Sequence, residues 1–314
     1  MGVDLMISVV IPVYNEKACL GDGFRRVHGV LQGVALPFEI IMVDDGSTDG
    51  TWQEIEALVQ CCPEARGVRL SRNFGKELAI CAGLDEVKGK AAILMDADMQ
   101  HPPELIPEMI RYWRDEQYEV VEAVKQDRGN ESVVSKACAH VFYRIMEKLS
   151  GIQLIGASDF KLLDERALDA WRRMGERNVF FRGMSAWIGF RRKQLGFEVQ
   201  ERQAGESKWS QWSLLRLALD AIVSFSTVPL RVVMVSGLLF FLFAIVMGVN
   251  TVYQFLAGEA VTGFSTVILL LLIVSSLMML ALGVIGEYLS KIYEEVKGRP
   301  RYVVADRCES SHGT

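Results

Sequence analysis

The sequence has little of what zinc sites, disulfide frameworks and nucleic-acid partners require. Its 314 residues include four scattered histidines, and a net charge of −5 gives no basic excess for binding nucleic acid. The cysteines show no metal-type spacing and stand at Cys19, Cys61, Cys62, Cys81, Cys138 and Cys308. We therefore expect no zinc ion, no nucleic-acid partner and, in a cytosolic domain, reduced cysteines.

The N-terminal segment MGVDLMISVVIP lacks the marks of a targeting signal. It has no basic region and no cleavage site, which argues against a signal peptide. Met6 does not fit the pattern for myristoylation, so we expect no lipid anchor of that kind.

Charge is absent from two long runs near the C-terminus. Val232–Gly258 and Ala260–Gly286 contain no Asp, Glu, Lys or Arg, and only Glu259 separates them. A spanning helix needs about 20 apolar residues, so we predict a hairpin of membrane helices over 229–258 and 260–287. The alternative, two buried helices of a soluble core, is disfavoured because such helices seldom run so far without a charge.

The basic residues around these runs predict the orientation of the chain. The link between the runs has none, whereas the flanks carry Arg216, Arg231, Lys291, Lys297, Arg299 and Arg301. By the positive-inside rule, we expect a multi-pass protein of the cytoplasmic membrane with both termini in the cytoplasm.

The segments on either side of the hairpin have patterns of their own. Apolar side chains of 207–228 share one helical face, namely Trp212, Leu215, Leu219 and Ile222. We interpret 207–228 as an amphipathic juxtamembrane helix, with an ordinary surface helix as the alternative. For 288–314 we predict a cytoplasmic helix followed by a tail, with disorder over the last dozen residues.

The first half of the chain alternates β-rich runs with helical patterns. Strands are predicted over 7–14, 38–45, 67–71, 91–98 and 119–125. Strands separated by helices of about a dozen residues predict a mostly parallel sheet in an α/β fold. Ligands of such sheets bind beyond the carboxyl ends of the strands. Polar residues gather at those ends, namely Tyr14, Asn15, Glu16, Asp44, Asp45, Asp96 and Asp98.

The stretch AAILMDADMQHPPE places oxygen-bearing side chains directly after an apolar strand. Asp96, Asp98 and Gln100 have the ligand chemistry that Mg²⁺ or Mn²⁺ prefers. A metal there would neutralise the diphosphate of a nucleotide leaving group. The alternative is that the two aspartates are turn residues.

Four motifs occur in a fixed order, VVIPVYNE, VDDGSTDGT, SRNFGKE and DADMQHPPE. Together they resemble the family 2 glycosyltransferases of the GT-A fold, over roughly residues 6–210. Further motifs make the resemblance more specific, namely SDFKLLDE, FFRGMSAWIGF, ERQAGESKW, SFSTVPLR and the hairpin ending in GEYLSKIYEEVKGRPRY. The whole chain is similar to polyprenyl-phosphate glycosyltransferases, most of all to the bactoprenol glucosyltransferase branch, relatives of dolichyl-phosphate mannose synthase.

The resemblance implies a Rossmann-like GT-A domain over 1–206 on the cytoplasmic side, ahead of the juxtamembrane helix and the hairpin. It implies inverting transfer of glucose from UDP-glucose to undecaprenyl phosphate. N-acetylglucosamine, galactose, mannose and an aminoarabinose derivative stay open as alternative sugars. A flippase, a downstream transferase and a homotetramer are the further partners that it implies.

The sequence gives less support to two alternative functions. A processive polysaccharide synthase would carry a Gln-x-x-Arg-Trp motif and more spans, and QWSLLR does not fit that motif. A non-catalytic membrane scaffold would have lost the metal aspartates, and spans without an internal charge offer no obvious transport pathway.

The resemblance also implies roles for donor-binding residues. Pro12, Tyr14 and Glu16 would line the nucleotide pocket, Asp45 would accept a hydrogen bond from the base, and Asp44 would be structural. The phosphates and sugar would meet Gly75, Lys76, Asp96, Ala97, Asp98, Arg202 and Lys208.

The same resemblance assigns the metal and the acceptor. Asp98 and Gln100 would hold Mg²⁺ or Mn²⁺, with Asp96 at the ribose, at the sugar or behind the metal ligands. Lipid phosphate would meet Lys125, Arg128 and Lys136, each of which could instead be a solvated surface charge. Asp159 would lie near the acceptor, as a general base or as a group that orients it. Asp159, Asp98 and Asp96 are thus the expected catalytic residues.

Overall fold

The computed structural model describes residues 5–98, 101–125, 157–177, 179–197, 228–257 and 263–310. The chain forms two compact units, and the C-terminal segment belongs to the first of them. The first unit comprises Met1–Lys208 with Arg299–Thr314, and the second comprises Trp209–Gly298.

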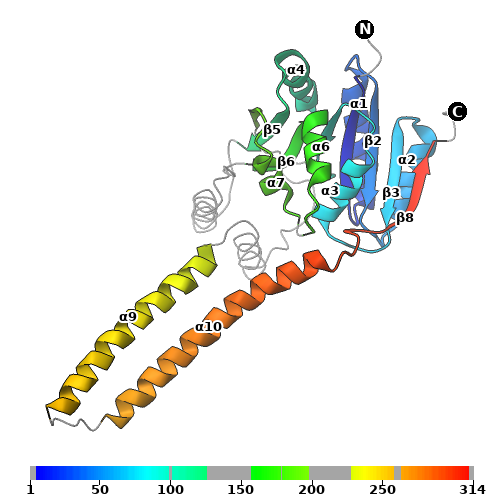
Figure 1. The fold of residues 1–314 in the computed structure, drawn as a ribbon. Helices are drawn as coiled ribbons and strands as arrows, with labels where there is room; N and C mark the ends of the chain where they lie inside the picture. Colours follow the sequence, from blue (N-terminus) through cyan, green and yellow to red (C-terminus); the bar gives the residue numbers. More distant parts are fainter. Residues whose placement is uncertain are drawn as a thin grey trace. The chain divides into compact units, whose positions relative to one another are not determined.

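A mixed, mostly parallel sheet forms the centre of the first unit. Within the described ranges its strand order is β7-β5-β6-β4-β1-β2-β3-β8, drawn in Figure 1. The strands are β1 Ile7–Val13, β2 Phe38–Asp44, β3 Ala65–Leu70, β4 Ala91–Leu94, β5 Val120–Lys125, β6 Ala157–Asp164, β7 Arg192–Phe197 and β8 Val304–Glu309. Strands β4, β1, β2 and β3 are parallel, whereas β6 runs antiparallel to both β4 and β5. The predicted α/β class is confirmed.

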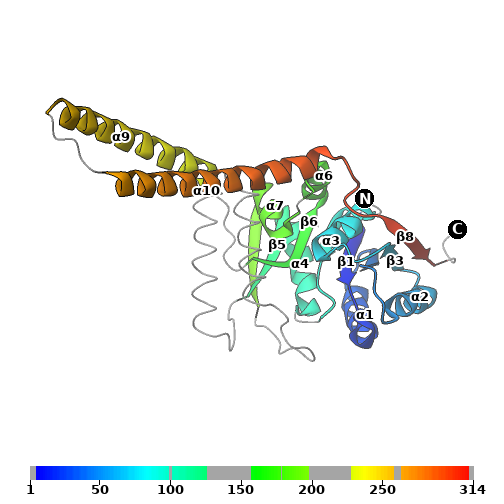
Figure 2. The ribbon, with the colours of Figure 1, turned by 90° about the horizontal axis from the view of Figure 1, so that it is seen from below.

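Helices cover both faces of this sheet. They are α1 Lys17–Gln32, α2 Thr51–Cys61, α3 Lys76–Asp85, the short 3₁₀ turn η1 Pro103–Leu105, α4 Ile106–Glu116, α6 Glu165–Arg173 and α7 Phe181–Trp187. Figure 2 shows α1, α2 and α4 on one face and α3, α6 and α7 on the other. Every residue of β1 is therefore buried, which explains why its sequence is apolar apart from Ser8.

Helix α3 packs unusually close to the sheet because Gly83 has no side chain. A Cβ atom at Gly83 would lie 2.3 Å from Val10 Cγ1 and 3.0 Å from Val43 Cγ2. This close approach fixes the position of α3, whose first residue is Lys76.

The C-terminal strand corrects one expectation. Disorder was predicted for the last dozen residues, yet Val304–Glu309 forms β8 and pairs antiparallel with β3. Its sequence is polar and, taken alone, is typical of a disordered tail. The strand forms because its side chains contact partners that are far away in the sequence.

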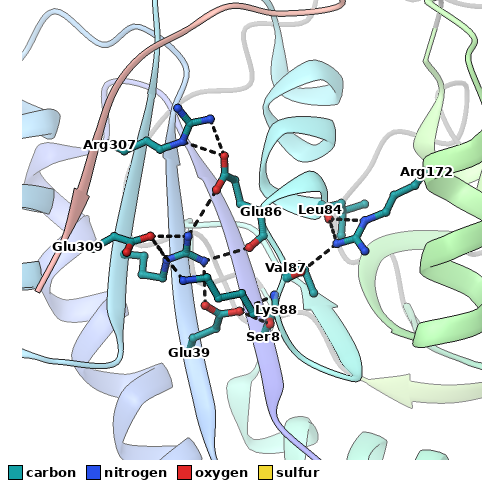
Figure 3. A network of polar contacts seen from close by, with 10 residues as sticks. Ser8, Glu39, Leu84, Glu86, Val87, Lys88, Arg172, Arg307 and Glu309 are labelled. Atoms are coloured by element: carbon teal, nitrogen blue, oxygen red, sulfur yellow. Dashed lines mark hydrogen bonds and ion pairs between the residues drawn. The ribbon is translucent and has the colours of Figure 1, made fainter. Parts of the chain in front are cut away.

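Those partners form what we call the Arg66 cluster, which comprises Arg66, Ser8, Glu39, Glu86, Lys88, Arg307 and Glu309. Arg66 donates to Glu39 Oε2 over 2.9 Å and to Glu309 Oε1 over 2.6 Å. Glu86 accepts from Arg66 and from Arg307. In Figure 3 carboxylates from β2, from the end of α3 and from β8 converge on one point.

Residues just before β8 are also attached to the first unit. Tyr302 donates its hydroxyl to Asp85 Oδ2 over 2.6 Å, and Arg301 donates to the carbonyl of Met174. From Arg299 onward, the segment after the predicted hairpin is therefore part of the α/β unit.

The second unit contains two long apolar helices, α9 Val228–Leu256 and α10 Phe264–Val296. Val228–Gln254 and Leu270–Val296 have mean hydropathies of 2.7 and 2.2, and neither window is buried. Both are long and apolar enough to cross a membrane. The predicted juxtamembrane helix lies, up to residue 227, outside the described residues.

Candidate active site

Two of the predicted carboxylates lie just beyond the carboxyl end of β4. The strand was expected to reach residue 98 but ends at Leu94, so that Asp96 and Asp98 stand in the loop that follows. Asp96 Oδ1 lies 2.6 Å from Lys76 Nζ, and its neighbour Ala97 is buried. The loop thus presents Asp96 to the first residue of α3.

The sheet register brings Asp159 to the same place. Lys161 of β6 pairs with Leu94 of β4 in antiparallel register, and continuing this register by two residues sets Asp159 opposite Asp96. Asp159 Oδ2 accepts from Lys76 Nζ over 2.7 Å. Three of the predicted site residues, Asp159, Lys76 and Asp96, therefore lie together.

A second cation completes this arrangement. Arg182 of α7 donates from Nε to Asp159 Oδ1 over 2.8 Å and from Nη2 to Oδ2 over 2.9 Å. Asp159 thus lies between a lysine and a bidentate arginine. We call Lys76, Asp96, Asp159 and Arg182 the Asp159 cluster.

The electrostatics of this cluster favour the ionised forms of Asp159 and Lys76. Burial acts to raise the pKa of Asp159, but the charges of Lys76 and Arg182 outweigh it and hold that pKa well below its ordinary value. Burial acts to lower the pKa of Lys76, and the carboxylates of Asp96 and Asp159 reverse this and raise it. A carboxylate held ionised by two cations is a poor proton acceptor, so the geometry favours an orienting role for Asp159.

Glu77, beside Lys76, has a different environment. Its Oε2 atom accepts the backbone N–H of Phe181 over 2.9 Å, which ties the start of α7 to α3. Burial, with the nearby negative charge of Asp159, raises the pKa of Glu77 to about 7.

Sequence reasoning assigned no role to Glu77 or Arg182. Both lie inside motifs that carried the resemblance, SRNFGKE and FFRGMSAWIGF. The local sequence could not show that α7 carries Arg182 to Asp159, because this contact depends on how α7 packs.

The loop before α3 is held by Asp45. The backbone N–H groups of Phe74 and Gly75 donate to the two carboxylate oxygens of Asp45, over 2.7 and 2.9 Å. Burial raises the pKa of this carboxyl against the effect of those two hydrogen bonds. Asp45 was expected to contact a nucleobase; here it supports the backbone turn at Gly75, whose φ is +100°. Asp44 accepts from the N–H of Ser47, the structural role expected for it.

The loop after β1 adjoins the loop after β2. Asn15 accepts from the N–H of Thr48 over 2.9 Å, while Glu16 donates its N–H to Thr51 Oγ1 over 3.1 Å. Pro12 lies within β1, and the side chain of Tyr14 is exposed. Tyr14 is thus placed where a ligand at the strand ends could reach it.

A buried ion pair lies behind Asp159. Lys161 Nζ is 3.2 Å from Glu122 Oε2 and donates to Ser185 Oγ over 2.7 Å. Burial lowers the pKa of Lys161, opposed by the charge of Glu122. Ser185 also donates to the carbonyl of Arg182, so this pair anchors α7 to the sheet.

Several predicted residues cannot be placed in this geometry. Outside the described residues lie Gln100, Arg128, Lys136, Arg202 and Lys208. Lys125 ends β5, and its side chain is likewise outside the description.

The described residues fit a divalent cation only in part. Among them, no three His, Cys, Asp or Glu side chains gather closely enough to hold an ion. Asp96 is already paired with Lys76. Mg²⁺ commonly takes one or two carboxylates and completes its coordination with water and substrate phosphates. Asp98 with Gln100 and a donor phosphate would meet that requirement.

Comparison with known families gives two matches along the chain. The family described as Glycosyl transferase family 2 matches residues 8–166. The family described as GtrB C-terminal hairpin matches residues 228–292, which includes α9 and most of α10.

Full-length relatives are similar from end to end. An uncharacterized glycosyltransferase of Synechocystis sp., sll0501, is 38% identical over 302 residues, which are 96% of this chain and 95% of the relative. The bactoprenol glucosyl transferase of Shigella phage SfX is 34% identical over 308 residues, 96% of this chain and 100% of the relative.

A solved structure shares the fold. Mannosyl-3-phosphoglycerate synthase from Rubrobacter xylanophilus aligns with a TM-score of 0.50 at 18% identity, covering 69% of this chain and 72% of that one.

Proposed function

The chain belongs to glycosyltransferase family 2, and from this premise we propose that it transfers glucose from UDP-glucose to a polyprenyl phosphate such as undecaprenyl phosphate. The observation that carries the proposal is the 34% identity to a bactoprenol glucosyl transferase along 96% of the chain. The likeness extends through the apolar helices, which a water-soluble acceptor would not require.

The proposed reaction forms one bond and breaks one. A phosphate oxygen of the acceptor attacks the anomeric carbon of the sugar, and the bond from that carbon to the donor diphosphate breaks with its electron pair. The configuration inverts, and the nucleoside diphosphate leaves. Because a lipid phosphate is ionised near neutral pH, the attack requires no general base. This is consistent with an Asp159 that is held ionised by Lys76 and Arg182.

The Asp159 cluster supplies positioning in this scheme. Lys76 Nζ contacts both Asp96 and Asp159. Its positive charge therefore lies beside the loop after β4, where the leaving diphosphate would bind. Asp98 and Gln100, with Asp96 nearby, would hold Mg²⁺ or Mn²⁺. The ion would supply charge neutralisation for the diphosphate.

Other contacts are proposed from the family resemblance alone. Pro12, Tyr14, Glu16 and Asp45 would surround the nucleoside, and the backbone at Gly75 and Ala97 would lie beside the phosphates and sugar. Arg202 and Lys208 would close over the diphosphate. Lipid phosphate would meet Lys125, Arg128 and Lys136.

We further propose that the reaction takes place at the cytoplasmic face of the membrane. The polyprenyl tail cannot leave the bilayer, so the catalytic unit has to work at its surface, and α9 and α10 provide an anchor. A GT-A domain over 1–206 and an interfacial helix over 207–228 would precede spans at 229–258 and 260–287, followed by 288–314. The proposed assembly is a homotetramer, with a flippase and a downstream transferase using the product.

A transfer assay tests the proposal. The purified chain in detergent is incubated with undecaprenyl phosphate, Mg²⁺ or Mn²⁺, and radiolabelled UDP-glucose, UDP-N-acetylglucosamine, UDP-galactose or GDP-mannose. We expect label from UDP-glucose in the lipid phase, and loss of that transfer when a chelator is added. Transfer from another donor would show that the enzyme uses a different sugar. The absence of lipid-linked label with every donor would contradict the proposal.

A further inference from the structure

We propose that Arg182 binds the phosphate of the acceptor, and that α7 positions it for this contact. The inference rests on the proposed function, since it assigns a residue to the acceptor of that same reaction. No residue of α7 has this role in the scheme above.

The exposed side chains of the Asp159 cluster are mainly cationic. Those of Lys76 and Arg182 are 43% and 35% exposed, whereas those of Asp96 and Asp159 are 22% and 6% exposed. A ligand therefore meets more positive than negative charge, although the cluster holds equal numbers of both. An anionic ligand fits such a surface.

The contacts of the cluster follow one order. Asp96 contacts Lys76, Lys76 contacts Asp159, and Asp159 contacts Arg182. The donor diphosphate would bind at the Asp96 end, beside the proposed metal ligands. Arg182 lies at the other end of this order, and we assign the acceptor phosphate to that end.

The chemistry of the guanidinium suits a phosphate. A guanidinium carries five N–H donors and binds both carboxylates and phosphates. Asp159 accepts from Nε and Nη2 of Arg182, and this orients the group so that its other N–H donors would meet a phosphate. A lysine at this position could not be oriented in that way.

Helix α7 is held in place by three contacts from other elements. Its first N–H group is bound by Glu77, and Ser185 is bound by Lys161 from within the sheet. The ring of Trp171 packs edge-on against Phe181, with 5.1 Å between centroids. The Lys161–Glu122 ion pair and the Glu77 carboxyl group are buried, and burying charged groups costs free energy. That such groups hold a helix of one to two turns is consistent with a need to place Arg182 accurately.

The test compares Arg182→Gln and Arg182→Lys with the wild-type chain in the transfer assay. KM is measured separately for undecaprenyl phosphate and for the nucleotide sugar. We expect Arg182→Gln to raise the acceptor KM about 10- to 100-fold, the effect of losing a charge-assisted hydrogen bond. The donor KM should stay within about twofold, and Arg182→Lys should fall between Gln and wild type.

The matched control is Arg191→Gln, at an exposed arginine whose guanidinium lies 4.9 Å from the ring centroid of Tyr118. It should leave both KM values unchanged. If Arg182→Gln does not fold, Arg182→Lys, which keeps the charge, decides the question.

Three results would overturn the inference: a donor KM that rises as much as the acceptor KM, a fall in kcat with neither KM changed, or no change at all. In each case the wild-type chain would still transfer sugar, so the proposed function would stand. A wild-type chain that transfers nothing to polyprenyl phosphate would instead remove the proposed function, and this inference with it.

Discussion

The Arg66 cluster and the Asp159 cluster lie in the same unit and both pair acidic with basic side chains, but they are arranged in opposite ways. In the first, one arginine is enclosed by the carboxylates of Glu39, Glu86 and Glu309. In the second, one carboxylate is enclosed by Lys76 and Arg182. The central charge is positive in one cluster and negative in the other.

The solvent exposure of the basic side chains shows the consequence of this difference. The Arg66 side chain is 11% exposed and donates five hydrogen bonds within the protein, so a ligand could not displace its partners at low cost. Lys76 and Arg182 hold a buried carboxylate and still reach solvent. The first arrangement ties β8 to the sheet, while the second presents cations to an anion. Variants of the first should therefore change stability, and variants of the second should change catalysis.

Arg66→Met should give the largest effect. It leaves the buried carboxylate of Glu39 without its cation, which should lower the free energy of unfolding by about 3–5 kcal/mol. Chemical denaturation of the purified chain in detergent measures this. The control, Arg25→Met, breaks an exposed pair with Asp22 and should change stability by less than about 0.5 kcal/mol. Equal effects of the two variants would contradict the structural role of the Arg66 cluster.

Glu77→Gln should show the free-energy cost of burying an ionised carboxyl group beside the Asp159 cluster. The folded-state pKa of Glu77 is raised from 4.5 to about 7, so between these values the folded chain binds more protons than the unfolded chain. Stability is then lost as pH rises through this window, by about 3 kcal/mol at most. The groups that act on Glu77 are Asp159, which raises its pKa, and Lys76, Arg182 and the Phe181 N–H, which lower it.

Glutamine does not titrate and can still accept the Phe181 N–H. We therefore expect Glu77→Gln to be more stable than wild type at pH 8 and to lose the dependence between about pH 4.5 and 7. Unfolding curves across this pH range measure it, with Glu108→Gln, at an exposed position of α4, as the control. A wild-type curve whose stability rises over that window would contradict the account.

Asp159→Asn should give a smaller effect, and on catalysis. Asparagine cannot hold Lys76 and Arg182 as a carboxylate does, so we expect kcat to fall about 10- to 100-fold while the donor KM changes little. Steady-state transfer kinetics measure both. Asp115→Asn, at an exposed pair with Arg114, should have no effect. An unchanged kcat would remove Asp159 from the site.

Much of the first unit follows from its sequence because local signals agree there. The buried runs of β1, β2 and β4 and the carboxylates after β4 predict a parallel sheet with a site at its carboxyl edge. Asp159 could be placed only through the resemblance, because its proximity to Asp96 depends on the antiparallel register of β6. No local pattern encodes that register.

Two features could not be predicted because they depend on distant packing. The strand β8 has the sequence VADRCE, and it is ordered by contacts such as that of Glu309 with Arg66, 243 residues away. The role of Asp45 as support for the turn at Gly75 likewise depends on how two loops meet. In both cases a polar residue is structural because its partners come from another part of the chain.

The most direct test of the central claim is the identity of the two products. Wild-type chain is incubated with UDP-glucose, undecaprenyl phosphate and Mg²⁺, and both the lipid and the nucleotide are analysed by mass spectrometry. The account predicts a lipid that carries one phosphate and one hexose, together with UDP. A lipid diphosphate linked to hexose, together with UMP, would contradict it, since the acceptor would then have attacked phosphorus and not the anomeric carbon.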